Sequence, residues 1–369
     1  MKARRWVIKA GSSLLTDHGR CLDTDFINQL VGQIAALRKQ GIECVIVSSG
    51  AVAAGLTRLG RTERPDTLHE LQAAAAIGQM GLIQAYESRF QTHDIHTAQI
   101  LLTHDDLSNR SRYLNARNTL ITLLSLNVIP IVNENDTVAT DEIKLGDNDT
   151  LAALVANLVE AERLVLLTDQ DSMYEADPNT DPNAKRIDTA QANDSRLLQM
   201  ASDGGVGKLG RGGMKTKVQA SMRAARSGAM TIIAGGKQEN ILLKLLADDK
   251  TTGTWIYPDQ EPVAARKRWL ASHLQVKGQL TLDDGAVKVL RNSGSSLLPV
   301  GVKKALGSFQ RGEAVECLDM SGNKVASGLI NYNSEETRKI IGNPSRKIEA
   351  ILGHIDEPEL IHRDNLVLF

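Results

Sequence analysis

The stretch from residue 128 to residue 169, VIPIVNENDTVATDEIKLGDNDTLAALVANLVEAERLVLLTD, contains the pattern that decides the fold. It opens with the apolar run Val128–Val132 and nears its end with a second apolar run, Leu164–Leu167. The apolar-rich segment Leu151–Glu160 between them has the length and spacing of a helix. Two buried strands joined by a helix are typical of a mostly parallel sheet covered by helices.

The same alternation extends over the first two-thirds of the chain. Further buried strands are expected at Trp6–Ile8, Val45–Val47 and Met230–Ala234. Helical spacing of apolar residues is found over residues 26–37 and 218–226. The sequence therefore predicts an α/β sandwich with a mainly parallel central sheet.

The character of the chain changes after about residue 260, where glycine-punctuated segments such as Gln279–Asp283 and Ala314–Leu318 predict short strands. These segments indicate a small, mostly-β module of about 100 residues. The proline-bounded stretch Pro258–Pro262 favours a linker before it. The expected organisation is a first domain over residues 1–258, a linker over 259–274 and a second domain over 275–369.

Length, composition and charge set limits on function. A chain of 369 residues is long enough for two domains, and its net charge of −1 argues against nucleic-acid binding through bulk positive charge. Aromatic residues make up 3%, which argues against base stacking as the main activity. The three cysteines are far apart, and no apolar run approaches the roughly 20 residues of a membrane span. We expect a reduced, cytoplasmic protein without a membrane segment.

Two small-residue motifs directly follow predicted strands, where ligands collect in open α/β folds. Lys9–Ser13 joins a cation to glycine and hydroxyl residues, a combination that can hold a phosphate. A surface lysine before a turn explains the same residues. Ser48–Gly55 can likewise line a ligand site or be a strand-to-helix turn with a serine N-cap.

Three further polar motifs lie after predicted strands, two of them between a buried strand and an apolar helix. Asn133–Thr137 and Gly146–Thr150 suggest recognition of a polar ligand, although a solvated loop with an Asp or Asn cap also fits. Thr168–Asp169 ends the run Leu164–Leu167, and an aspartate at a strand end can hold Mg²⁺ through water or orient a lysine.

The segment Gly204–Lys217 combines six glycines with four cations. No strand immediately precedes it, and the sequence has no G-x-x-x-x-G-K-[ST] motif, so neither a dinucleotide fingerprint nor a P-loop is predicted. A flexible, basic lid over a polyphosphate is our interpretation, with a merely solvated loop as the alternative.

As a set, these motifs resemble the glutamate 5-kinase family of the amino acid kinase superfamily. The residues that carry the resemblance are Val7–Ser12, Ser48–Ala51, Asn133–Asp136, Lys144–Asp149, Leu167–Gln170 and Gly212–Lys217. The tail, including Gly294–Pro299 and Gly301, resembles the PUA domain of that family. The resemblance covers nearly the whole chain and implies a three-layer kinase sandwich followed by a PUA-like domain. Two departures from the family are Ser172, near which the family usually has glycine, and Arg211, where threonine is common.

The resemblance implies ATP-dependent phosphorylation of the γ-carboxylate of L-glutamate to L-glutamyl 5-phosphate, in proline biosynthesis. Lys9 and Lys217 match the lysines that neutralise phosphoryl charge, and Asp169 matches the aspartate that orients them. Ser49, Asp136 and Asn148 match glutamate-binding positions, with Asn133 and Asp149 close by. The positions that match nucleotide-binding residues are Lys9, Thr168, Asp169, Arg211, Gly212, Gly213, Met214, Lys215, Thr216 and Lys217. Mg²⁺ would be held mainly by the ATP phosphates rather than by protein ligands.

The resemblance also implies feedback inhibition by L-proline, contact with glutamate-5-semialdehyde dehydrogenase, and a homo-oligomer, dimeric or tetrameric. Two alternatives stay open. One is another amino acid kinase, acting on aspartate or acetylglutamate. The other is an RNA-binding protein that uses residues 260–369, although 15 Lys and Arg against 13 Asp and Glu, a net charge of +2, leave a weak electrostatic footprint there.

Overall fold

The computed structural model describes residues 4–17, 21–61, 63–139, 148–178, 180–202, 213–259, 276–293 and 295–369. The chain divides into two compact units, one of residues 1–108 with 115–265 and the other of residues 109–114 with 266–369. Of the predicted linker, only Asp259 belongs to the described residues, so the domain boundaries given above stay a prediction.

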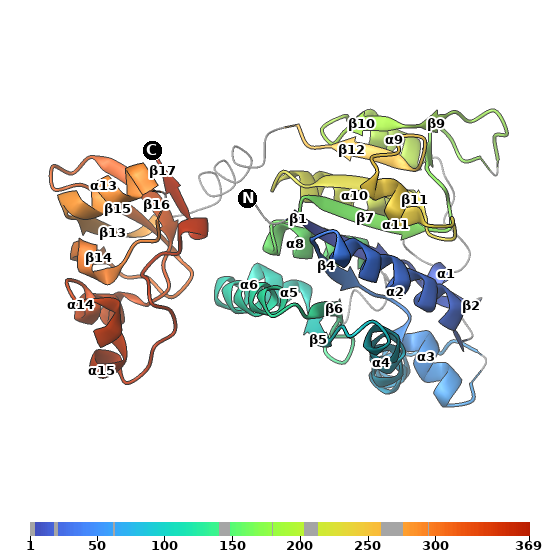
Figure 1. Cartoon of the computed structure of the whole chain (residues 1–369), viewed down its shortest axis with the longest axis horizontal. Helices are drawn as coiled ribbons and strands as arrows, with labels where there is room; N and C mark the ends of the chain where they lie inside the picture. Colours follow the sequence, from blue (N-terminus) through green and yellow to red (C-terminus); the bar gives the residue numbers. More distant parts are fainter. Residues whose placement is uncertain are drawn as a thin grey trace. The chain divides into compact units, whose positions relative to one another are not determined.

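The first unit is built on an eight-stranded sheet (Figure 1). Its neighbouring strands pair in parallel, except β11 with β12, which are antiparallel. In spatial order the strands are β10 (Thr189–Gln191), β12 (Thr254–Tyr257), β11 (Met230–Gly235), β7 (Arg163–Thr168), β1 (Arg4–Ala10), β4 (Ile42–Val47), β6 (Ile129–Glu134) and β5 (Thr97–Leu102). The predicted α/β sandwich with a mainly parallel sheet is confirmed.

Helices and two small hairpins complete this part of the chain. The helices are α1 (Ser12–Leu15), α2 (Thr24–Lys39), α3 (Ala51–Arg58), α4 (Leu68–Gln91), α5 (His104–Ser108), α6 (Arg110–Ser125), α8 (Asn148–Leu158), α9 (Arg196–Ser202), α10 (Met214–Ala225) and α11 (Ile241–Leu246). The hairpins pair β2 (Thr16–Asp17) with β3 (Cys21–Leu22), and β8 (Met173–Tyr174) with β9 (Arg186–Ile187). None of the helices in the described residues is long and apolar enough to span a membrane.

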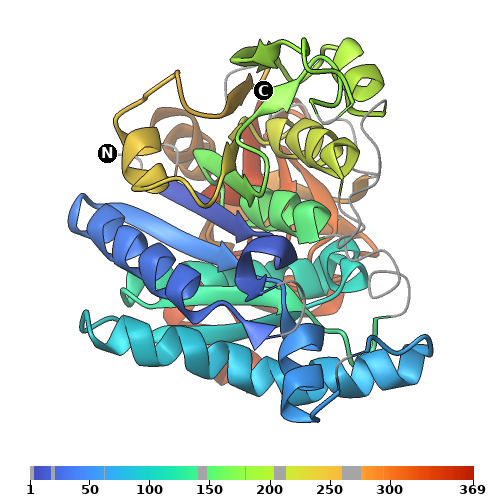
Figure 2. The same cartoon turned by 90° about the vertical axis from the view of Figure 1, so that its right-hand side faces the viewer.

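Successive side chains of β1 point to opposite faces of the sheet. Trp6 and Ile8 belong to the apolar core that also contains residues of α2, α4 and α11. Lys9, one residue further, points to the opposite face because side chains alternate along a strand. That face is covered by α8 and α10, which lie side by side (Figure 2). The first face is thus mainly apolar along β1, and the second carries the buried Lys9 near the carboxyl edge of the sheet.

The second unit contains a five-stranded sheet in the order β14 (Val302–Gly307), β13 (Val276–Leu282), β15 (Ala314–Leu318), β16 (Lys324–Leu329) and β17 (Leu366–Leu368). Its helices are α13 (Asp284–Ser293), α14 (Ser334–Ile340) and α15 (Ile348–Leu352), with 3₁₀ turns at Pro299–Gly301, Ser345–Lys347 and Arg363–Asn365. The strands pack around a separate apolar core, so the predicted mostly-β module is confirmed.

Two element boundaries differ from the expectation in ways that matter for the site. Helix α8 begins at Asn148, three residues before the expected start, so Asn148 and Asp149 lie in a helical turn rather than in a loop. Helix α10 begins at Met214, so the last four residues of Gly204–Lys217 are helical and our interpretation of a single loop was wrong there. Residues 203–212 lie outside the described part of the chain.

Candidate active site

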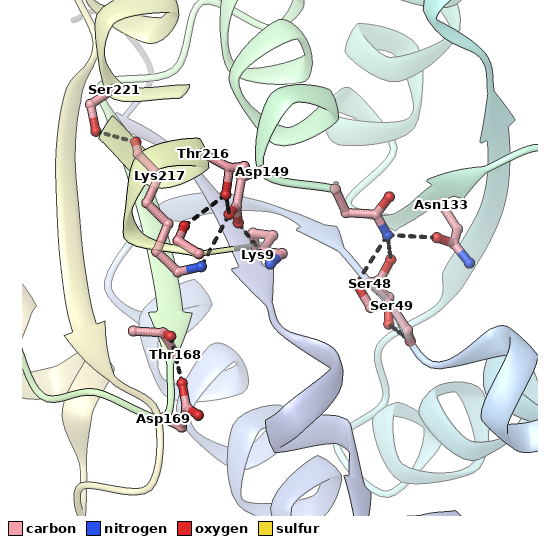
Figure 3. Close-up of polar contacts among 12 residues, drawn as sticks. Lys9, Ser48, Ser49, Asn133, Asp149, Thr168, Asp169, Thr216, Lys217 and Ser221 are labelled. Atoms are coloured by element: carbon pink, nitrogen blue, oxygen red, sulfur yellow. Dashed lines mark hydrogen bonds and ion pairs between the residues drawn. The ribbon is translucent and has the colours of Figure 1, made fainter. Parts of the chain in front are cut away.

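Polar residues gather where the central parallel strands end. Strands β7, β1, β4 and β6 are consecutive neighbours that run in the same direction, so their carboxyl ends share one edge of the sheet. Lys9, Ser48, Asn133 and Thr168 lie at these four ends. The first turn of α8 meets them there, and its consecutive residues Asn148 and Asp149 contact different neighbours (Figure 3).

Asp149 joins two lysines from distant parts of the sequence. Its Oδ1 lies 2.7 Å from Lys9 Nζ, and its Oδ2 lies 3.1 Å from Lys217 Nζ (Figure 3). Thr216 Oγ1 donates to the same Oδ2 at 2.9 Å. Lys9 is 6% exposed, Lys217 5% and Asp149 fully buried. We call Lys9, Asp149 and Lys217 the ion cluster.

The electrostatics of the ion cluster favour an anionic ligand. Burial alone raises the pKa of the Asp149 carboxyl, but the two adjacent ammonium groups outweigh it and hold that pKa well below its usual range. The carboxylate is therefore charged at neutral pH. Two cations and one anion leave a surplus of one positive charge, held on rigid elements where water is largely excluded. Such a group can stabilise negative charge on a transferred phosphoryl group.

The position of Asp169 differs from the expectation that it orients both lysines. In the structure the carboxylate that pairs with both is Asp149, whereas Asp169 is exposed and accepts a hydrogen bond from Thr168 Oγ1 at 3.0 Å (Figure 3). The physical reason is placement, since Asp149 enters from α8 between the two ammonium groups while Asp169 lies just beyond the end of β7. A role for Asp169 toward the nucleotide stays a prediction.

Helix α10 presents Lys217 from its first turn. Gly213 is its N-cap residue, and the Gly213 carbonyl oxygen lies 2.8 Å from Thr216 Oγ1, whose single proton it shares with Asp149 Oδ2. Thr216 and Lys217 both turn to Asp149, whereas Lys215 is exposed on the other side of the turn. The helix thereby brings a cation and several backbone N–H groups toward the carboxyl edge of the sheet. Arg211 and Gly212 lie outside the described residues.

Asn148 organises a second, uncharged group of residues. Its Nδ2 lies 2.7 Å from the Ser48 carbonyl oxygen, 3.0 Å from Ser49 Oγ and 3.1 Å from Asn133 Oδ1, so its two N–H bonds are shared among three acceptors (Figure 3). We call Ser48, Ser49, Asn133 and Asn148 the amide network. It connects the ends of β4 and β6 with the start of α8, and neutral groups of this kind can orient a zwitterionic amino acid by hydrogen bonds.

The turn after β4 shows why the Ser48–Gly55 motif needs its residue types. Gly50 has φ of 95°, a left-handed conformation that favours glycine, and it is the N-cap of α3 without a side-chain cap. The serine N-cap that we considered does not occur there, and Ser49 Oγ instead accepts from Asn148. Asp136, predicted to bind glutamate, is half-buried in the turn three residues beyond Asn133.

Sequence reasoning missed two residues behind the amide network. Gln79 and Tyr86, both buried on α4, hydrogen-bond to Asn133 and Ser48 respectively. They left no recognisable signal, because a glutamine and a tyrosine within a helix otherwise rich in Ala and Leu fit a helix surface equally well. Among the described residues, no three His, Cys, Asp or Glu side chains gather as a metal site.

Comparisons with known proteins agree with this architecture. A model of the Amino acid kinase family matches residues 4–234, and one of the PUA domain matches residues 278–352. The carbamate kinase of Giardia lamblia bound to AMP-PNP has a similar fold, with a TM-score of 0.51 and 15% identity over 70% of this chain and 99% of that one.

Curated relatives extend the match to the full length. The glutamate 5-kinase of Nitrosococcus oceani is 63% identical over 99% of this chain and 97% of its own. That of Chromohalobacter salexigens is 59% identical over 100% of this chain and 96% of its own. With this identity and the two domain matches in the same order, the chain belongs to the glutamate 5-kinase family, whose amino acid kinase domain is followed by a PUA domain.

Proposed function

We infer that the chain transfers the γ-phosphoryl group of ATP to the γ-carboxylate of L-glutamate and forms L-glutamyl 5-phosphate, the first step of proline biosynthesis from glutamate. The observation that carries this conclusion is the ion cluster and the amide network side by side at one edge of the sheet, joined by the consecutive residues Asn148 and Asp149. The names of the full-length relatives give the acceptor amino acid.

The chemistry requires alignment and charge neutralisation rather than proton transfer. A γ-carboxylate has a pKa of about 4.3, so it is already ionised at neutral pH and can attack without a general base. One carboxylate oxygen forms a bond to the γ-phosphorus as the bond to the β,γ-bridging oxygen breaks, and ADP leaves. Lys9 and Lys217 stabilise the negative charge on the phosphoryl oxygens during this transfer, while Asp149 keeps both ammonium groups in place.

The two substrates divide the site between them. For glutamate we propose Ser49, Asp136 and Asn148, with the anionic Asp136 suited to the α-ammonium group. For ATP we propose Lys9, Thr168, Asp169 and the segment Arg211–Lys217, of which residues 213–217 are described. Both carboxylate oxygens of Asp149 are engaged by lysines, which supports Mg²⁺ binding mainly through ATP phosphate oxygens.

The decisive experiment is ADP release with glutamate, aspartate and acetylglutamate as acceptors, measured side by side with the full chain. We expect turnover with glutamate and little with the other two. If aspartate or acetylglutamate is turned over faster than glutamate, the chain is still a kinase but its acceptor is that amino acid. No release of ADP with any of the three would overturn the proposed function.

Regulation and assembly are further proposals that rest on the family. We propose a cytoplasmic homo-oligomer, dimeric or tetrameric, that is inhibited by L-proline and contacts glutamate-5-semialdehyde dehydrogenase. Unchanged rates in millimolar proline would argue against the inhibition. For residues 260–369, salt-dependent RNA binding would support the alternative function, which their small net charge of +2 disfavours.

A further inference from the structure

One face of α4 lies behind the amide network. Gln79 and Tyr86 are seven residues apart, two helical turns, so they lie on the same face as the buried Leu82. Gln79, 8% exposed, contacts Asn133 at the end of β6. The fully buried Tyr86 hydroxyl lies 3.2 Å from Ser48 Oγ at the end of β4. A single helix therefore contacts both strand ends that contribute to the amide network.

The hydrogen bonds of Asn133 fix the direction in which its amide points. Its Oδ1 accepts from the backbone N–H of Glu134 at 2.9 Å, and a backbone N–H can only donate. The Asn133 amide must therefore present oxygen on that side and Nδ2 on the other. Nδ2 donates to Gln79 Oε1 at 2.8 Å. Gln79 is thus the acceptor that holds this orientation.

Hydrogen bonds to the same network also fix the orientation of the Asn148 amide. Its Nδ2 donates to Asn133 Oδ1 and to the Ser48 carbonyl, which can only accept, so Nδ2 faces the protein. Asn148 Oδ1 is consequently the end that can meet the substrate. An acceptor oxygen suits the α-ammonium of an amino acid, whereas an NH₂ group in its place would repel it.

We propose that Gln79 is a positioning residue for the acceptor amino acid, acting through Asn133 to keep Asn148 Oδ1 directed toward the substrate. The inference rests on the proposed function and adds a residue that does not itself touch substrate. Gln79 Nε2 is buried and has no hydrogen-bond partner among the described residues. The hydrogen bond that Gln79 makes there is the one in which its Oε1 accepts from Asn133. Without Gln79, the buried Nδ2 of Asn133 would lose its acceptor, and only the N–H of Glu134 would still hold the Asn133 amide in place for Asn148.

The backbone packing of α4 makes it a firm support for this arrangement. A β-carbon on Gly55 of α3 would lie 1.7 Å from the Ala74 carbonyl oxygen, and one on Gly78 would lie 1.9 Å from the Ala51 carbonyl oxygen. Helices α3 and α4 therefore touch backbone to backbone, and Gly78 directly precedes Gln79. The helix that fixes Asn133 also fixes the start of α3, next to Ser49.

The test replaces Gln79 by a residue of the same shape without polar atoms. In Gln79→Met we expect the KM for glutamate to rise about tenfold, the loss of roughly one well-placed hydrogen bond. The KM for ATP and kcat should stay within about twofold of the wild type, since the hydrogen bond of Gln79 goes to Asn133 and not to the ion cluster. Leu82→Met, on the same buried face, is the matched control for altered packing and should leave both KM values unchanged.

Gln79→Glu distinguishes positioning from stability. It keeps an acceptor oxygen for Asn133 but buries an ionisable carboxyl, so its Tm should be lower than that of Gln79→Met. The KM of Gln79→Glu for glutamate should nevertheless lie closer to the wild-type value than that of Gln79→Met. The less stable of the two variants should therefore bind glutamate better. If Gln79→Glu does not fold, the glutamate KM of Gln79→Met compared with that of Leu82→Met still tests the positioning role.

Two failures can be told apart. A wild-type chain that releases no ADP with glutamate overturns the proposed function and this inference with it. An active wild type with an unchanged glutamate KM in Gln79→Met, or with an equal rise in the KM for ATP, overturns the positioning role alone.

Discussion

The ion cluster and the amide network start from consecutive residues of one helix and differ in almost everything else. Asp149 turns to two lysines and builds a charged, buried group, whereas the neighbouring Asn148 turns to neutral partners on β4 and β6. Charge is concentrated where phosphoryl transfer would need it, and neutral hydrogen bonds lie where an amino acid would be selected. We propose that the start of α8 divides the site, with groups that set the rate on one side and groups that bind the acceptor on the other.

The largest effect should come from Asp149→Asn, which leaves Lys9 and Lys217 buried without a counter-charge. Removing one partner of a buried ion pair typically costs about 3–5 kcal/mol, and both lysines lose their fixed positions. We expect Tm to fall by about 10 °C and kcat by about a thousandfold. Thermal unfolding and ADP release measure the two. Glu70→Gln, in the exposed ion pair with Arg61, is the control and should change Tm far less.

The pH dependence of stability sharpens the same prediction. The pKa of Asp149 is depressed in the folded chain, so its contribution to stability is present above the unfolded value of about 3.9 and is lost as pH falls through the folded value. Asp149→Asn should therefore lose stability less steeply than the wild type below about pH 4. Parallel stability curves of the two proteins in acid would contradict the charged state of the ion cluster.

Lys217→Ala should separate rate from binding. The variant keeps the Lys9–Asp149 pair, so it should fold, while kcat falls by about 10²–10³ and the KM for glutamate stays within about threefold. Arg226→Ala, an exposed cation at the other end of α10, is the control. Turnover like that of the wild type in a folded Lys217→Ala variant would remove Lys217 from the mechanism.

Asn148→Ala should give the reverse pattern. Loss of the Asn148 amide removes the centre of the amide network. The KM for glutamate should therefore rise about tenfold to thirtyfold, with a much smaller change in kcat. Asn157→Ala removes an amide from the far end of the same helix, where Nδ2 bonds to the Arg223 carbonyl, and should cost stability without altering this KM. If both variants change kcat and KM alike, the helix start does not divide the site.

How much the sequence could predict follows from the same contrast. Strands such as β7 were predictable because continuous apolar runs need a buried sheet, and Lys9 because a cation ends such a run. The carboxylate that pairs with the lysines was not predictable, because the sequence offers several aspartates after strands. Packing of α8 against β1 and α10 brings Asp149 to the two cations. Gln79 was missed for the same reason, because its contact depends on how α4 packs.

The smallest expected effect tests whether every polar residue near the strand ends serves the site. Ser172, in the loop after β7, is fully buried, and its hydroxyl has no hydrogen-bond partner among the described residues. Its φ is not positive, so the backbone there does not require glycine. We expect Ser172→Ala to raise Tm by about 2–4 °C, because a buried unpaired hydroxyl costs about 1 kcal/mol.

Ser172→Gly completes this test, since glycine removes the same hydroxyl but adds freedom to the unfolded chain. It should be less stable than Ser172→Ala by about 0.4–1 kcal/mol. Neither variant should change kcat or the KM for glutamate, because the Ser172 hydroxyl makes no hydrogen bond to a described residue of the ion cluster or the amide network. A loss of stability in Ser172→Ala would mean that the hydroxyl is satisfied in solution, and a raised KM for ATP would add this loop to the nucleotide side of the site.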